Sequence, residues 1–215
     1  MIAIIDYKLS NMFSVKNALD YLGVESVITS EKSVVAQSDA AIIPGVGAFG
    51  DAMKNLKDFS LIPVINEHVK KGKPFMGVCL GLQLIFSESN EFGNHKGLNL
   101  IPGKVRKFSS KGRSASGRKV PQIGWNQIRS GRNPSLWEKT PLKNTRDKEF
   151  MYFVHSFYVI PNDKSVILSE TNYEGTDYCS AVIYENIFAT QFHPEKSGKH
   201  GISIYQEWIK SNKSK

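Results

Sequence analysis

The sequence is poor in cysteine, in long apolar runs and in acidic residues relative to basic ones. Its two cysteines, Cys79 and Cys179, are too few for a disulfide framework, so we expect a reducing, cytoplasmic location. No apolar run approaches the ~18–20 residues that span a bilayer. The first residues carry no basic segment ahead of an apolar stretch, so no signal peptide is expected. Hydrophobic residues still make up 40% of the 215 residues, which suffices for a core and excludes a wholly disordered protein.

The excess of basic charge is concentrated in one segment. The chain has 28 Lys and Arg residues against 20 Asp and Glu residues. Residues 103–120 hold seven of the basic residues and no acidic one, which leaves 21 basic residues outside the segment. The segment is rich in Ser and Gly, and Phe108 is its only aromatic residue, which favours a solvated hairpin arm. A nucleic-acid site and an anionic partner surface are the alternatives.

The first half of the sequence alternates strand-like and helix-like patterns. Met12, Val15, Leu19 and Leu22 recur at steps of three and four, which is typical of one helix face, and Gly23 follows them. Short apolar runs, typical of buried parallel strands, occupy residues 2–6, 24–29, 39–44 and 74–78. Further helices are expected over residues 51–71, with a break near Pro63, and 80–87. This alternation predicts an α/β fold with a parallel sheet covered by helices on both faces.

The second half has closely spaced strand-like runs instead. They occupy residues 151–160, 165–170, 178–184 and 187–192, with turn residues at 161–163 and 185–186, and a final helix is expected over 201–210. Such spacing is typical of antiparallel strands. Since no repeat or linker divides the chain, residues 1–215 are predicted to form one α/β domain with an antiparallel β extension.

Gly77-Val78-Cys79-Leu80-Gly81 lies where a strand-like run meets a helix-like segment. A nucleophile on so tight a turn is exposed above the sheet, and glycine neighbours are needed because side chains there would crowd the turn. The backbone N–H of Leu80 would then face a developing oxyanion. A buried structural cysteine is the alternative interpretation.

A second motif, Gln191-Phe192-His193-Pro194-Glu195, follows the last strand-like run. A thiol nucleophile needs a base, and the base needs a group that fixes its tautomer. Because His193 and Glu195 are two residues apart, both side chains leave the same side of an extended chain. The alternative is an exposed turn without catalytic use. A zinc site of the H-x-E type is not expected, because no cysteine follows Glu195.

A third motif, Pro44-Gly45-Val46-Gly47, ends the run expected beside the Cys79 strand. Its glycines permit a backbone flip that aims an N–H group at a substrate carbonyl. A resting state in which the N–H of Val46 points away is therefore available. Taken alone, the motif is typical of an ordinary turn.

In this order, the motifs resemble the class I (triad-type) glutamine amidotransferases. The pairing of GxCxGxQ at 77–83 with HPEKSG at 193–198 carries the resemblance. PGVGAF at 44–49 and GWN at 124–126 narrow it to the glutaminase subunits of imidazole glycerol phosphate synthases, in the histidine pathway. It runs almost end to end, and further matches are IDY at 5–7 with Asn11, PGKV at 102–105 and YFVHSF at 152–157.

The resemblance implies a flavodoxin-like sheet and a glutaminase that needs no cofactor or metal. It implies that Cys79 attacks the side-chain amide of glutamine, that His193 acts as base and then acid, and that Glu195 orients His193. Oxyanion and glutamine contacts are expected from Val46, Gly47, Leu80, Gln83, Ser156 and Phe157. A cyclase subunit with a β/α-barrel fold is the implied partner in a heterodimer, with an interface near Asn11, Trp125 and Lys196.

Two departures from the family pattern leave alternatives open. Lys8-Leu9-Ser10 stands where the family commonly has Gly-x-Gly, and Gln122 stands where a histidine often precedes GWN. Both are expected toward the partner face, so they concern the pathway that accepts the ammonia and not the glutaminase chemistry. One alternative is a paralogous subunit that supplies ammonia for amidation of a surface-polysaccharide sugar. A cysteine peptidase with the same triad, and a non-catalytic nucleic-acid or scaffold protein using the basic segment, are the others.

Overall fold

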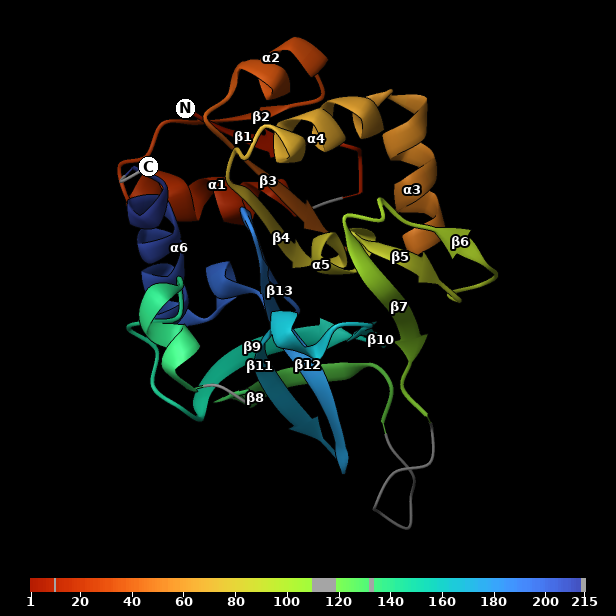
Figure 1. Cartoon of the computed structure of the whole chain (residues 1–215), viewed down its shortest axis with the longest axis vertical. Helices are drawn as coiled ribbons and strands as arrows, with labels where there is room; N and C mark the ends of the chain where they lie inside the picture. Colours follow the sequence, from red (N-terminus) through yellow and green to blue (C-terminus); the bar gives the residue numbers. More distant parts are fainter. Residues whose placement is uncertain (10, 110–118, 132–133, 214–215) are drawn as a thin grey trace.

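The structure, a computed structural model, describes residues 1–9, 11–109, 119–131 and 134–213 (Figure 1). Its centre is a run of five neighbouring parallel strands in the order β2-β1-β3-β4-β13. Their bounds are β1 (Ile2–Ile5), β2 (Ser26–Thr29), β3 (Ala40–Gly45), β4 (Phe75–Cys79) and β13 (Ile187–Thr190). The crossovers hold α1 (Met12–Tyr21), α2 (Lys32–Gln37), α3 (Phe49–Asp58), α4 (Leu61–Lys70) and α5 (Leu80–Leu84).

Helices cover both faces of this parallel sheet because its strands are apolar on both faces. In β1, Ile4 belongs to one buried cluster with Leu19 of α1 and Trp208 of α6 (Gly198–Lys213). The next residue, Ile5, belongs to the other cluster with Leu56 of α3, so alternate residues enter opposite cores. Figure 1 shows α6 beside α1, away from α3 and α4. The predicted two-faced α/β sheet is confirmed.

The antiparallel extension joins the parallel sheet at β13. This strand pairs parallel with β4 and antiparallel with β12. From β12 the sheet continues through β10, β7, β5 and β6, while β11, β8 and β9 branch from β12. The bounds are β5 (Phe86–Ser89), β6 (His95–Lys96), β7 (Ile101–Lys107), β8 (Gln122–Ser130), β9 (Glu149–His155), β10 (Phe157–Pro161), β11 (Ile167–Tyr173) and β12 (Thr176–Tyr184). Short 3₁₀ helices are η1 (Pro134–Lys139), η2 (Lys164–Val166) and η3 (Pro194–Lys196).

Two predicted helices have different bounds in the structure. The helix expected over 51–71 is two helices that part at Phe59 and Ser60, not at Pro63, and Ser60 adopts a positive φ of 54°. Pro63 lies in the first turn of α4, where the missing N–H has no helical acceptor to lose. The helix expected over 80–87 ends at Leu84, because Phe86 begins β5.

Some strands were also misread or missed. The run 151–160 is two strands, β9 and β10, which part at Ser156. The strand β13 belongs to the parallel sheet through β4, although the pattern grouped it with the antiparallel strands. The elements α2, β5, β6 and β8 were not predicted, because their polar residues hide any clear periodicity, and β7 was missed because most of it was assigned to the solvated arm.

The described beginning of the basic segment 103–120 is part of the sheet and not a solvated arm as predicted. Its residues 110–118 lie outside the described residues. Its first residues form β7, where Lys104 and Arg106 pair with Glu88 at 3.4 and 3.1 Å. Phe108 is buried and stacks on Tyr158 at 4.8 Å between ring centroids, so this aromatic residue belongs to the core.

Among the described helices, none combines the length and the apolar character needed to cross a membrane.

Candidate active site

Cys79 lies at the carboxyl end of β4, directly before α5, in a strained backbone conformation. Its φ is 55° and its ψ is −107°, a region that residues with a side chain rarely adopt. A Cβ on Gly77 would lie 2.9 Å from the carbonyl group of Gly81, and a Cβ on Gly81 would lie 1.8 Å from the carbonyl oxygen of Ile43. Both flanking glycines are therefore required, as the sequence predicted. The expectation that the nucleophile is exposed was wrong, because Cys79 is only 4% exposed and reaches the outside through a cavity that it lines.

A cavity of about 260 Å³ opens beside Cys79. Every residue for which a glutamine or oxyanion contact was expected lines it: Val46, Gly47, Leu80, Gln83, Ser156 and Phe157. They come from the loop after β3, from α5 and from the junction of β9 and β10. The parallel sheet brings the first two groups together because the carboxyl ends of β3 and β4 are neighbours.

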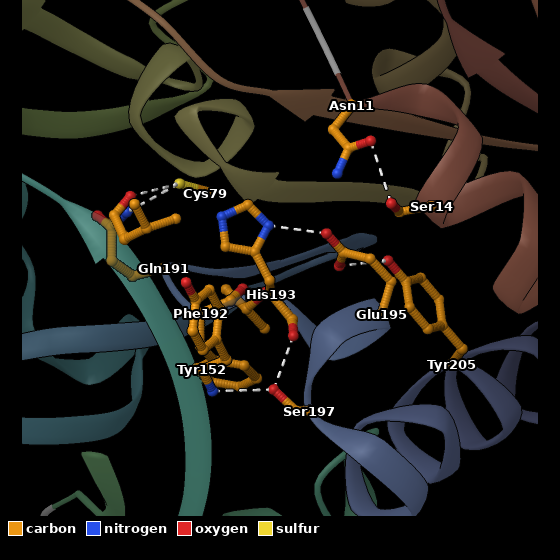
Figure 2. A network of polar contacts seen from close by, with 12 residues as sticks. Asn11, Ser14, Cys79, Tyr152, Gln191, Phe192, His193, Glu195, Ser197 and Tyr205 are labelled. Atoms are coloured by element: carbon orange, nitrogen blue, oxygen red, sulfur yellow. Dashed lines mark hydrogen bonds and ion pairs between the residues drawn. The ribbon is translucent and has the colours of Figure 1, made fainter. Parts of the chain in front are cut away.

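His193 and Glu195 form a buried pair at the carboxyl end of β13, next to Cys79. His193 Nδ1 lies 2.7 Å from Glu195 Oε1, and both side chains are 2% exposed. Figure 2 shows the imidazole between Cys79 and Glu195. Burial alone would lower the pKa of His193, but the Cys79 thiolate, followed by Glu195, outweighs it and raises this pKa to about 10. The arrangement therefore favours the protonated form of the His193 imidazole.

The backbone of His193 is fixed by the neighbouring strand β9. His193 N–H donates to the carbonyl of Tyr152 at 2.9 Å, and the Ser197 hydroxyl donates to the carbonyl of His193 at 2.7 Å. Ser197 Oγ in turn accepts from the N–H of Tyr152 at 3.0 Å (Figure 2). Tyr205 of α6 donates its hydroxyl to Glu195 Oε2 at 3.4 Å. Both the base and its carboxylate partner are thus held in place from two sides.

The N–H of Val46, the candidate oxyanion donor, points away from the cavity in this structure. It donates to the carbonyl of Leu9 at 3.2 Å. Gly47 has a φ of 103°, which only glycine adopts readily. The loop is thus in the resting orientation that the flanking glycines were expected to allow. The N–H of Leu80 opens α5, so the helix itself does not use that donor.

Several residues at the site were missed by sequence reasoning. Glu91 lines the cavity, is 8% exposed, and accepts the N–H of Phe49 at the start of α3 at 2.7 Å. Burial raises the pKa of Glu91, while the hydrogen bond from Phe49 opposes that shift. Gln191 donates its amide N–H to Cys79 Sγ at 3.7 Å. Gln191 stands in the quoted QFHPE motif and could have been singled out there, whereas no local pattern marks Glu91.

Gln122 was expected toward the partner face, and the structure buries it instead. Its side chain is 2% exposed and its Oε1 lies 3.0 Å from the Tyr178 hydroxyl, which is 3.3 Å from His155 Nε2. At this end of β8, Gln122 alternates with Ile123, which is 64% exposed, so the two side chains lie on opposite faces of the strand. This departure from the family pattern therefore lies behind the cavity wall.

The three residues expected at a partner interface come from elements that are linked by successive contacts. Trp125 of β8 is 56% exposed, and Lys196 of η3 is exposed. Asn11, partly exposed, precedes α1 and accepts a hydrogen bond from Ser14 at 3.1 Å. Helix α1 contacts η3, η3 contacts β9, and β9 pairs with β8. Trp125 also packs edge-on against Tyr152, whose carbonyl accepts the N–H of His193, so Trp125 lies close to the catalytic pair.

Comparisons with known proteins identify the family to which the chain is related. A family model described as class-I glutamine amidotransferase matches residues 3–210. Imidazole glycerol phosphate synthase subunit HisH of Aquifex aeolicus is 43% identical over 209 residues, covering 95% of this chain and 94% of that protein. The protein of the same name in Syntrophotalea carbinolica is 44% identical over 210 residues, covering 97% and 98%. The solved structure of PurLQS from Thermotoga maritima shares the fold, with a TM-score of 0.72 at 19% identity and 97% coverage of both chains.

Proposed function

The chain belongs to the class-I glutamine amidotransferases, and we propose that it is the glutaminase subunit of an imidazole glycerol phosphate synthase in histidine biosynthesis. The relatives that carry this subunit's name match it over almost its whole length. The observation that carries the chemistry is the meeting of Cys79, His193 and Glu195, from the ends of β4 and β13, beside one small cavity. We propose further that residues 1–215 form one amidotransferase domain.

The reaction begins with a covalent step at Cys79. The thiolate attacks the side-chain amide carbon of glutamine and gives a tetrahedral oxyanion. The N–H of Leu80 faces that oxyanion, and the N–H of Val46 joins it once the bond to Leu9 opens. His193 then donates its proton to the leaving nitrogen, ammonia departs, and a γ-glutamyl thioester remains. A water molecule, deprotonated by His193, releases glutamate and restores the thiolate.

The cavity suits an amino acid with both of its charges. The Glu91 carboxylate is the one acidic group among the residues that line the cavity, and it takes the α-ammonium of glutamine. Gln83 and the backbone of Ser156 and Phe157 hold the rest of the substrate. A cavity of about 260 Å³ matches the size of a single small amino acid. This favours glutamine hydrolysis over peptide cleavage.

Ammonia passes to a partner rather than to water. The partner is a cyclase subunit with a β/α-barrel fold, in a cytoplasmic heterodimer. It docks on the face that Asn11, Trp125 and Lys196 share, next to the catalytic pair. A surface-sugar pathway is the competing acceptor, and the names of the matched relatives favour histidine biosynthesis over it.

The test measures glutamate release by the chain mixed with an imidazole glycerol phosphate cyclase and its nucleotide substrate. Wild type should release glutamate and drive imidazole formation, and Cys79→Ala should do neither with glutamine yet support turnover with added ammonia. Cys179→Ala, a matched change at the other buried cysteine, should stay active. Glutaminase activity retained in Cys79→Ala, or peptide cleavage in place of glutamine hydrolysis, would refute the proposal.

A further inference from the structure

The carbonyl oxygen of Phe157 fixes the orientation of two buried side-chain amides, those of Gln83 and Gln191. A backbone carbonyl only accepts, so the Gln83 atom 3.0 Å from it is the amide nitrogen. The same nitrogen lies 3.2 Å from the Gln191 side chain, which must therefore present its oxygen to Gln83. The other end of the Gln191 amide, its nitrogen, then faces Cys79 Sγ at 3.7 Å. The orientation of both amides follows from the one carbonyl.

A second group holds the carbonyl of Phe157 in place. His155 Nδ1 lies 2.8 Å from it, so His155 carries its proton on Nδ1. Burial lowers the pKa of His155 to about 4, so this imidazole stays neutral at physiological pH. The carbonyl that orients Gln83 is thus anchored by a neutral donor whose protonation does not change near neutral pH.

Gln191 itself is rigidly placed and shielded from water. The residue is fully buried, and Gln83 is 4% exposed. Its backbone N–H donates to the carbonyl of Ser180 at 2.8 Å, which fixes the end of β13 against β12. A buried N–H that lost its acceptor would cost free energy, and the acceptor that the described residues offer this amide nitrogen is the Cys79 sulfur. Figure 2 shows the Gln191 side chain reaching Cys79 from the side opposite His193.

We propose that Gln191 is a positioning residue whose amide N–H stabilises the Cys79 thiolate and turns it toward the cavity, while its carbonyl end ties the sulfur to Gln83. The inference rests on the proposed function, since it assigns a role within the same reaction. Gln191 does not contact the substrate in this account. It couples the side chain that holds glutamine to the atom that attacks it.

Three other titratable side chains face the sulfur and must be considered in any pH measurement. Tyr7 follows β1, Tyr178 lies on β12, and His193, backed by Glu195, follows β13. Burial, followed by the Cys79 charge, raises the pKa of Tyr7, and burial is also the largest cause raising the pKa of Tyr178, so both stay neutral. Cys79 and His193 titrate as a coupled pair, so a change in the profile on substituting Gln191 is read as a change in this pair, with both tyrosines neutral throughout.

The experiment follows alkylation of Cys79 by iodoacetamide as a function of pH, with the labelled peptide identified by mass spectrometry. The variants are Gln191→Met, which keeps the length and removes the donor, and Gln191→Glu, which places a carboxylate beside the sulfur. Gln206→Glu on the exposed face of α6 makes the same chemical change away from the site and serves as control. Far-UV circular dichroism and thermal unfolding establish that each variant is folded. Glutamine hydrolysis in the complex with the cyclase provides kcat and KM.

Gln191→Met is expected to alkylate about tenfold more slowly near neutral pH, with the midpoint of the profile higher by about one unit. Its kcat should fall by about tenfold and its KM change less than about twofold, because Gln83 keeps its bond to Phe157. Gln191→Glu should show a larger upward shift, and Gln206→Glu none.

An unchanged pH midpoint in folded Gln191→Met overturns the inference, and so does failure of both variants to fold, because the residue would then be structural. Wild-type Cys79 that does not react as a thiolate refutes the proposed function instead. Wild-type reactivity with unchanged variants refutes only the role of Gln191.

Discussion

The isolated chain should be a poor glutaminase, and the cyclase partner should activate it. In the structure the N–H of Val46 is bonded to the carbonyl of Leu9, so one of the two oxyanion donors is turned away. The experiment adds the cyclase partner to the lone chain and then adds the nucleotide substrate of the cyclase. Leu9 lies two residues before Asn11, on the expected interface, so a partner that displaces this segment releases the Val46 donor.

The size of the expected activation follows from two hydrogen bonds of the Val46 N–H, one to the oxyanion and one to the carbonyl of Leu9. Absence of one oxyanion donor costs about 2.7–4 kcal/mol of transition-state stabilisation, or roughly 10²–10³-fold in kcat. Opening the bond between Val46 and Leu9 costs about 0.5–1.5 kcal/mol, which a protein interface readily supplies. Gly45 and Gly47 lower the cost of the backbone rotation itself. We therefore expect the full complex to exceed the lone chain by at least about 10²-fold in kcat.

The assay is steady-state glutamate release by the lone chain, by the chain with the cyclase, and by the complex with a substrate analogue bound. KM for glutamine should change little, since Gln83, Ser156 and Glu91 already line the cavity. A lone chain that turns over as fast as the full complex would show that the Val46 N–H is not needed or not withheld. The loop would then be an ordinary turn.

Further predictions concern the triad and the segment after β1. Glu195→Gln should lose less activity than His193→Ala, and the double variant should be far from additive, because both residues act through one imidazole; additive losses in kcat would show that they act separately. The raised pKa of His193 keeps the imidazole protonated up to about pH 10, so kcat/KM should fall only as the pH passes that value. Glu195→Gln should move this fall in kcat/KM to lower pH, because Glu195 helps to raise the pKa of His193. Lys8 has a φ of 67°, a conformation that costs a residue with a side chain about 1–2 kcal/mol. Lys8→Gly should therefore raise the free energy of unfolding by up to ~1 kcal/mol. A lower melting temperature in thermal unfolding would contradict this.

The central sheet and the nucleophile turn were predictable from sequence because local constraints define them. Apolar runs such as residues 39–44 have few other stable placements than a buried parallel strand. The turn at Cys79 needs glycine on both sides for steric reasons that the sequence displays directly. His193 and Glu195 are two residues apart, so their proximity to each other is local as well.

The features that were missed in the site and the fold depend on contacts between residues distant in sequence. Glu91 reaches the cavity only because the loop after β5 folds back over the start of α3, which no local pattern encodes. Gln122 was misplaced because its side of β8 depends on the register with β9. The helix break at Ser60 was missed because proline, the stronger local signal, is tolerated in a first helical turn.

The most direct test of the central claim is to trap the acyl-enzyme. The complex is mixed with glutamine, quenched in acid within the first turnovers, and analysed by intact mass and peptide mapping. We expect a mass increase of one γ-glutamyl group on the peptide that contains Cys79, absent in Cys79→Ala and unchanged in Cys179→Ala. Rapid glutamate release without any adduct on Cys79, or an adduct on Cys179, would contradict it.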